Sequence, residues 1–106
     1  MADTKPEEKA ISIPPDALTD PDAREMLRAW VAHEGLHCTL NIGQWGEREA
    51  IGWGVLLSDV ARHVAQAMHK ATGAEPKDVL EEIRDVFNEE LDEPTSDTSG
   101  GFIQIQ

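Results

Sequence analysis

The residues with the strongest chemical signature are His33, Glu34 and His37, which fit the zinc-peptidase pattern H-E-x-x-H. In that pattern, two histidines one helical turn apart bind zinc and the glutamate activates a water molecule. The pattern requires a continuous helix through both histidines, yet Gly35 is typical of a helix end and His37 belongs to an alternating segment. No Gly-x-x-His extension follows to supply a third ligand. We therefore expect neither a bound metal nor zinc hydrolysis.

A second set of chemical groups lies within a predicted long helix, where Asp59 precedes Arg62 by three residues and His63 by four. At these spacings the carboxylate can reach either neighbour on the helix surface. The simpler interpretation is a solvated face whose exposed ion pairs are worth at most about 1 kcal/mol. The alternative is a small-ligand or catalytic site in which His63 changes its protonation state.

Aromatic and small residues gather where the same helix begins. Trp53 lies between Gly52 and Gly54, and Trp45 precedes the helix. We expect Trp53 to lie in the core. Trp45 either packs as a lid on the domain or stays exposed as an anchor for a partner protein, since tryptophan is enriched at interface hot spots.

Cys38 is the single cysteine, which excludes an internal disulfide bond and a metal site built from several thiolates. Its position on the apolar side of an alternating segment favours a buried structural thiol over a catalytic one. A chain without disulfides fits a reducing compartment, and the polar first residues contain no secretory signal. We expect a cytoplasmic protein.

The charge of the chain excludes other classes of function. Nine Lys and Arg residues stand against 21 Asp and Glu, which gives a formal net charge of −12. Such a chain repels phosphate backbones, so we expect no nucleic-acid partner. Charged residues interrupt every apolar run well before the ~20 residues that a membrane span needs, so we expect no membrane partner.

Hydrophobic periodicity predicts the elements that position these groups. We expect a short strand over residues 11–13, a helix over 20–34 closed by Gly35, a strand over 36–42, a helix over 49–72 closed by Gly73, and a helix from Pro76 whose outer face is acidic. Residues 102–106 either form an edge strand or remain a loose end. The first strand would pair with the second in parallel, through a right-handed crossover helix.

These elements predict an α+β fold: a single two-layer domain with a small β-sheet packed against about three helices, in the order β-α-β-α-α. Residues 1–9 are expected to be a flexible N-terminus, residues 10–91 the domain, and residues 92–106 a mostly flexible polar tail with a short strand as an option over 102–106.

The segments 13–18, 22–30 and 53–63 resemble the small alphaproteobacterial proteins grouped as domain of unknown function 5076. The most recognisable part is the run Trp53-Gly-Val-Leu-Leu-Ser-Asp-Val-Ala-Arg-His63, and the resemblance extends over roughly residues 10–92. It implies a soluble bacterial domain and carries over no catalytic role.

The sequence thus favours a non-enzymatic protein-binding or regulatory module without a cofactor. Its partner would be another protein or a second copy of the chain, held through residues 45–55 or through the acidic third helix. The alternative is a small-ligand-binding or catalytic domain that uses Asp59, Arg62 and His63.

Overall fold

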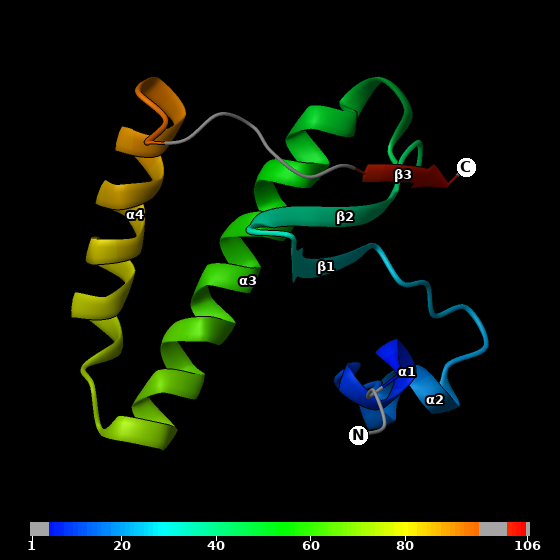
Figure 1. Ribbon diagram of the computed structural model, residues 1–106, viewed down its shortest axis with the longest axis horizontal. Helices are drawn as coiled ribbons and strands as arrows, with labels where there is room; N and C mark the ends of the chain where they lie inside the picture. Colours follow the sequence, from blue (N-terminus) through cyan, green and yellow to red (C-terminus); the bar gives the residue numbers. More distant parts are fainter. Residues whose placement is uncertain (1–4, 96–101, 106) are drawn as a thin grey trace.

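The computed structural model describes residues 5–95 and 102–105 of the chain. The elements, in chain order, are α1 (Pro6–Lys9), α2 (Pro15–Thr19), β1 (Leu27–Ala32), β2 (Gly35–Asn41), the 3-10 helix η1 (Gly46–Arg48), α3 (Glu49–Thr72), α4 (Pro76–Asp92) and β3 (Phe102–Ile105). The α3–α4 hairpin forms one layer, and the strands cross the upper half of α3 in Figure 1. The predicted α+β class and single domain are confirmed.

The sheet has three strands in the order β1-β2-β3. β1 and β2 run antiparallel, with Trp30 opposite His37, whereas β2 and β3 run parallel, with Cys38 opposite Phe102. The sequence left two possibilities open for the C-terminal segment, and residues 102–105 join the sheet as an edge strand. The proposed flexibility of residues 96–101 lies outside the described residues.

The helix predicted over residues 20–34 is wrong, because most of that segment forms a turn and then β1. Asp20 and Pro21 suit the start of a helix, but they suit an Asx turn equally well. Here a side-chain oxygen of Asp20 accepts the backbone N–H of Asp22 at 2.8 Å, and its carbonyl accepts the N–H of Ala23 at 3.1 Å. The cap therefore closes a turn, and the chain enters β1 extended.

A tight hairpin joins β1 to β2, so the predicted parallel crossover is also wrong. His33 and Glu34 form its two-residue loop, with φ values of 49° and 62°. Two consecutive left-handed residues make a type I′ turn, which matches the twist of paired strands. Gly35 lies in β2 and caps no helix. Residues 11–13, predicted as a strand, lie outside every strand.

The two long helices lie where the apolar stripes predicted them. α3 ends at Gly73, whose φ of 79° gives the left-handed cap, and α4 begins with Pro76 in its first turn. No helix among the described residues is long and apolar enough to cross a lipid bilayer.

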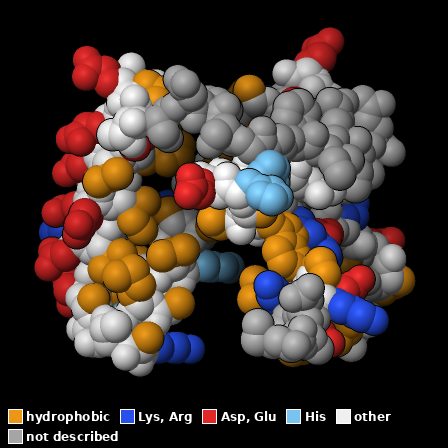
Figure 2. All heavy atoms as spheres, viewed as in Figure 1, with side chains coloured by type: hydrophobic (Ala, Val, Ile, Leu, Met, Phe, Trp, Pro, Cys, Tyr) orange, Lys and Arg blue, Asp and Glu red, His pale blue; other side chains and the backbone are white. Residues whose placement is uncertain are grey.

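Little of the described chain is fully covered. Among residues 5–95, Ala65 and Val79 are the buried apolar residues, and no large side chain is completely buried. The Cα radius of gyration is 16.0 Å, against about 13 Å for a compact chain of this length. Figure 2 shows an open space between the helical hairpin and the N-terminal segment with α1 and α2. Leu18 of α2, for instance, is 70% exposed.

Candidate binding groove

Glu49 organises the corner where the loop after β2 meets α3. Its carboxylate accepts the backbone N–H of Gly43 at 2.9 Å, the backbone N–H of Trp45 at 2.9 Å, and the indole N–H of Trp53 at 2.8 Å. Gly43 has a φ of 102°, a conformation that a residue with a side chain adopts only under strain. One side chain in the first turn of α3 therefore fixes the loop and both tryptophans.

These hydrogen bonds also change the acidity of Glu49. The bond from the Gly43 N–H contributes most, followed by that from Trp45, and together they lower the pKa of the Glu49 carboxyl below its usual value. Hydrogen bonds to the charged form favour that form, which is the physical cause of the shift. Glu49 is therefore held as an anion at neutral pH.

Trp45 packs directly on the backbone of α3. A Cβ atom at Gly52 would overlap Cδ2 of the Trp45 indole, so the ring occupies the space that any other residue would fill. The Trp45 and Trp53 rings meet edge to face, with centroids 5.7 Å apart and an interplanar angle of 89°, an arrangement that aromatic pairs favour. Both rings are half-buried. The indole of Trp45 therefore covers part of α3 and is itself partly exposed to solvent.

An open groove of about 510 Å³ extends from Trp45 along α3. We call it the Trp45 groove. Its lining is mostly apolar and consists of Trp45, Arg48, Ile51, Gly52, Val55, Leu56, Asp59, Val60 and His63. Ile51 and Val55 are 57% and 58% exposed. Ile51 and Val55, the apolar residues in the first turns of α3, thus form the floor of a surface groove.

The groove brings together three of the five predicted site residues. Trp45 lies at one end of its lining, and Asp59 and His63 lie toward the other. Trp53 supports the groove through its edge-to-face contact with Trp45. Arg62 is not among the lining residues; its guanidinium donates to Asp59 at 3.0 Å in an exposed ion pair. The two regions that the sequence offered as alternatives therefore share one surface.

The H-E-x-x-H segment lacks the scaffold that zinc chemistry requires. His33 and Glu34 form the hairpin turn, while His37 lies in β2 and its Nε2 is 3.2 Å from the carbonyl oxygen of Ala32. Across the described ranges, no group of three or more His, Cys, Asp or Glu side chains is arranged to hold a metal ion. Cys38, predicted to be buried, is half-buried in β2.

The sequence alone singled out neither Glu49 nor Arg48, and it did not explain why residue 52 is a glycine. A glutamate in the first turn of a helix is ordinary, because it complements the helix dipole. Nothing in its type marks it as the acceptor for two backbone amides and an indole. Gly52 stands out in the sequence as a small residue. The need for a glycine there follows only from the Trp45 ring, which the loop places against it.

Comparison with known proteins identifies the family. The model of the family Domain of unknown function (DUF5076) matches residues 10–95. This chain belongs to the DUF5076 family. The match covers β1, β2, α3 and α4, and therefore the whole Trp45 groove.

A solved structure resembles the DUF5076 chain along most of its length. It is a protein of the photosynthetic bacterium Rhodopseudomonas palustrus CGA009, provisionally described as a pyruvate dehydrogenase. The two sequences are 32% identical, the similarity covers 93% of this chain and 95% of that one, and the TM-score is 0.63. No curated protein matches the chain significantly.

Proposed function

We propose that this DUF5076 chain is a protein-binding module that holds an amphipathic helix of another protein in the Trp45 groove. The observation that carries the proposal is the row of exposed apolar side chains beside a fixed tryptophan. Ile51 and Val55 are each more than half exposed, and with Trp45 they line one continuous surface. Exposed apolar patches of this kind mark interaction sites, and helices commonly dock into apolar grooves.

The groove is organised before any partner arrives. Glu49 holds the loop through the backbone N–H of Trp45, and the indole rests on Gly52. A surface that needs no ordering on binding loses less conformational entropy, so more of the contact energy becomes affinity. This preorganisation supports a dedicated docking site.

The charges favour a basic partner segment. Asp59 lies in the lining, and the chain as a whole carries a net charge of −12. A helix with apolar anchors and a flanking Lys or Arg would complement both features, and the long-range attraction would speed its association. The acidic outer face of α4 would assist in steering without forming the contact.

A crosslinking experiment tests this proposal. A photoreactive amino acid at Val55 should capture a partner in cells of the native host, whereas the same residue at Glu89 on the acidic face of α4 should not. The captured segment is then synthesised and titrated into the purified chain. Val55→Asp should weaken its binding by roughly thirty-fold or more, as expected for a hot-spot residue.

Three controls separate the groove from other surfaces. Val31→Asp makes the same change at an exposed valine of β1, outside the groove lining and outside the α3–α4 hairpin, and should leave the affinity unchanged. Trp45→Ala should reduce binding, whereas neutralising Asp78, Glu82 and Glu89 should mainly slow association. Equal capture from Val55 and Glu89, or full affinity in Val55→Asp, would refute the proposal.

A second candidate function is small-ligand binding, favoured because Asp59 and His63 line the same groove. The volume falls within the range of ligand sites, although the groove is open whereas most such sites enclose their ligand. Native mass spectrometry of the chain from its host distinguishes the two functions. A co-purifying small molecule lost in both Asp59→Asn and Val55→Asp would favour the ligand.

The description of the related protein as a pyruvate dehydrogenase does not guide our proposal. Oxidative decarboxylation of a 2-oxo acid requires a cofactor that stabilises a carbanion. The groove is largely apolar, with Arg48 as its one lining residue of fixed positive charge. The acidic chain also repels an anionic substrate. These properties support a binding role over that reaction.

A further inference from the structure

The chain exposes far more surface than one folded domain of its mass normally does. Its accessible surface is 9222 Å², whereas a folded monomer of this mass exposes about 5,900 Å². The excess is about 3,300 Å² per chain on the same scaling relation. Buried apolar surface is the main stabilising contribution to a fold, so an excess of this size indicates that the fold is completed by something else.

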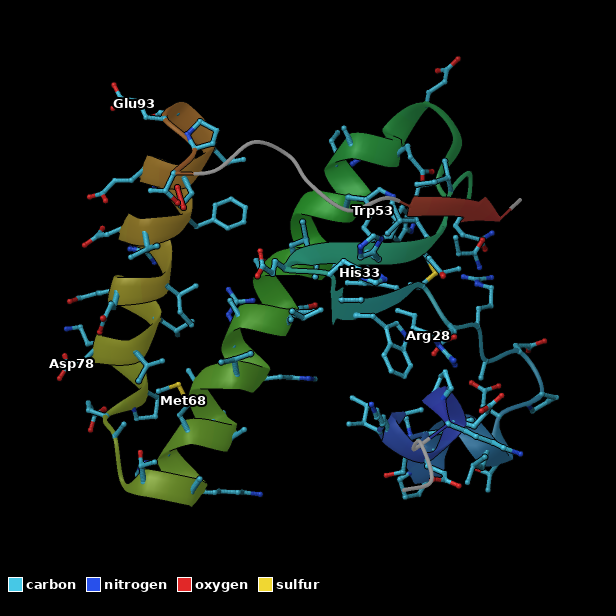
Figure 3. All side chains as sticks on the ribbon, in the orientation of Figure 1. Arg28, His33, Trp53, Met68, Asp78 and Glu93 are labelled. Atoms are coloured by element: carbon cyan, nitrogen blue, oxygen red, sulfur yellow. The ribbon has the colours of Figure 1, made fainter. Side chains whose placement is uncertain are left out.

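Part of this uncovered surface is apolar and lies on one side of the α3–α4 hairpin. We call it the hairpin face; it consists of Leu57, Val64 and Met68 of α3 with Val86 and Phe87 of α4. These side chains are between 39% and 52% exposed. Figure 2 shows hydrophobic side chains gathered over α4 and toward α3, with acidic side chains along the outer edge of α4. In Figure 3, Met68 lies between the two helices.

The residues of the hairpin face have the spacing of core positions. Leu57, Val64 and Met68 follow the three-to-four-residue repeat of a helix stripe, which the sequence alone predicts to face the core. Within the described chain, that core contains only Ala65 and Val79 as buried apolar residues. A surface needed for folding must be covered permanently, and a transient partner cannot do that.

We infer that the hairpin face is the interface between two copies of this chain. A second copy is present wherever the first is made, and a twofold axis lets the same face cover itself. Two helical hairpins packed face to face form a four-helix bundle, a common arrangement of paired hairpins. Covering the hairpin face would remove part of this excess, and each partner of an obligate dimer buries roughly 1,000–2,500 Å².

The charge distribution permits this pairing in spite of the net charge. Asp78 points away from α3 in Figure 3, on the outer side of α4. Asp78 can therefore stay in solvent while the apolar faces meet. Repulsion between two acidic chains would still weaken the dimer at low ionic strength, so added salt should tighten it.

The hairpin face is separate from the Trp45 groove, so the dimer does not depend on the proposed function. Val55 and Val64 are nine residues apart on α3, which places them about 180° apart around the helix. Val55→Asp and Val86→Asp therefore make the same chemical change on two different surfaces, since Val55 lines the groove and Val86 does not.

Sedimentation velocity of the full chain over a wide concentration range provides the test. The wild type should sediment with twice the chain mass, and Val86→Asp should raise the dimer dissociation constant by roughly thirty-fold or more. Val55→Asp should dimerise like the wild type. If Val86→Asp fails to fold, the milder Val86→Ala should still raise the dimer dissociation constant, and the melting temperature of the wild-type dimer should rise with protein concentration.

Two results would overturn the inference. One is a wild-type monomer whose melting temperature is independent of protein concentration. It would mean that a second copy does not cover the hairpin face and that a different protein does. A dimer that persists unchanged in a folded Val86→Asp variant would mean that the two copies meet through another surface.

Discussion

The two halves of α3 are built on different principles. At its first turns, the Glu49 carboxylate accepts three hydrogen bonds, and Trp45 fills the space above Gly52. Farther along, Val64 and Met68 belong to an apolar stripe that remains about 40% exposed. The contacts that fix the first region all come from one chain. The apolar side chains of the second region have the spacing of core residues, but nothing in the described chain covers them. Polar contacts fix a local geometry, but only apolar burial on a larger scale completes a fold.

The sharpest way to break this comparison is a pair of glycine substitutions two residues apart in α3. Gly52→Ala should lower the free energy of unfolding by about 1–3 kcal/mol, because the new methyl group overlaps Trp45. Gly54→Ala should raise it by about 0.5–1 kcal/mol, since a Cβ there meets no atom within 4 Å and alanine favours the helix. Urea denaturation followed by tryptophan fluorescence measures both. A stabilising Gly52→Ala would mean that Trp45 does not rest on α3.

Acid titration sharpens the same comparison at Glu49. Its pKa is lowered in the folded state, so its stabilising effect is present above the unfolded pKa of about 4.3 and is lost as pH falls through the folded value. The stability difference between the wild type and Glu49→Gln should therefore be constant near neutral pH and shrink in acid. Denaturant unfolding at a series of pH values gives this difference.

Glu47→Gln, at an exposed neighbour in η1, is the matched control for that titration. It removes a carboxylate from the same stretch of chain, so it should leave the stability at neutral pH close to that of the wild type. A difference between the wild type and Glu49→Gln that does not change with pH would contradict the role assigned to the Glu49 carboxylate.

The smallest effect is expected at the hairpin turn. Replacing His33 and Glu34 together by Asn and Gly should stabilise the chain by about 0.5–1 kcal/mol, because this pair suits a type I′ turn. A helix through the segment would respond in the opposite direction, since an internal glycine costs a helix about 1 kcal/mol relative to alanine. Thermal and urea unfolding of the double variant distinguish the two structures.

The sequence predicted the elements whose patterns had a single interpretation. The long stripe of α3 ends at Gly73, and Pro76 follows at the start of α4, so both boundaries agree with the structure. The segment before β2 did not have a single interpretation. Leu27 and Trp30 fit a helical stripe, but pairing with β2 outweighs local propensity. The segment forms a strand because it pairs with β2, and hydrophobic periodicity carries no information about such pairing.

The candidate site was partly predictable for a related reason. Trp45, Asp59 and His63 stand out by residue type, and all three line the groove. Their convergence on one surface depends on how the loop before α3 folds back, which is set by Glu49. An exposed residue type can suggest a role, whereas a residue that positions others is recognised only from its contacts.

The central claim is that the Trp45 groove, and not the hairpin face, holds a partner protein. Calorimetric titration of the crosslinked partner segment into Val55→Asp and Val31→Asp tests it most directly, because the same substitution is made at one exposed valine inside the groove and one outside both surfaces. We predict that Val55→Asp loses the affinity of the wild type and that Val31→Asp keeps it. Wild-type affinity in Val55→Asp, or an equal loss in both variants, would contradict the claim.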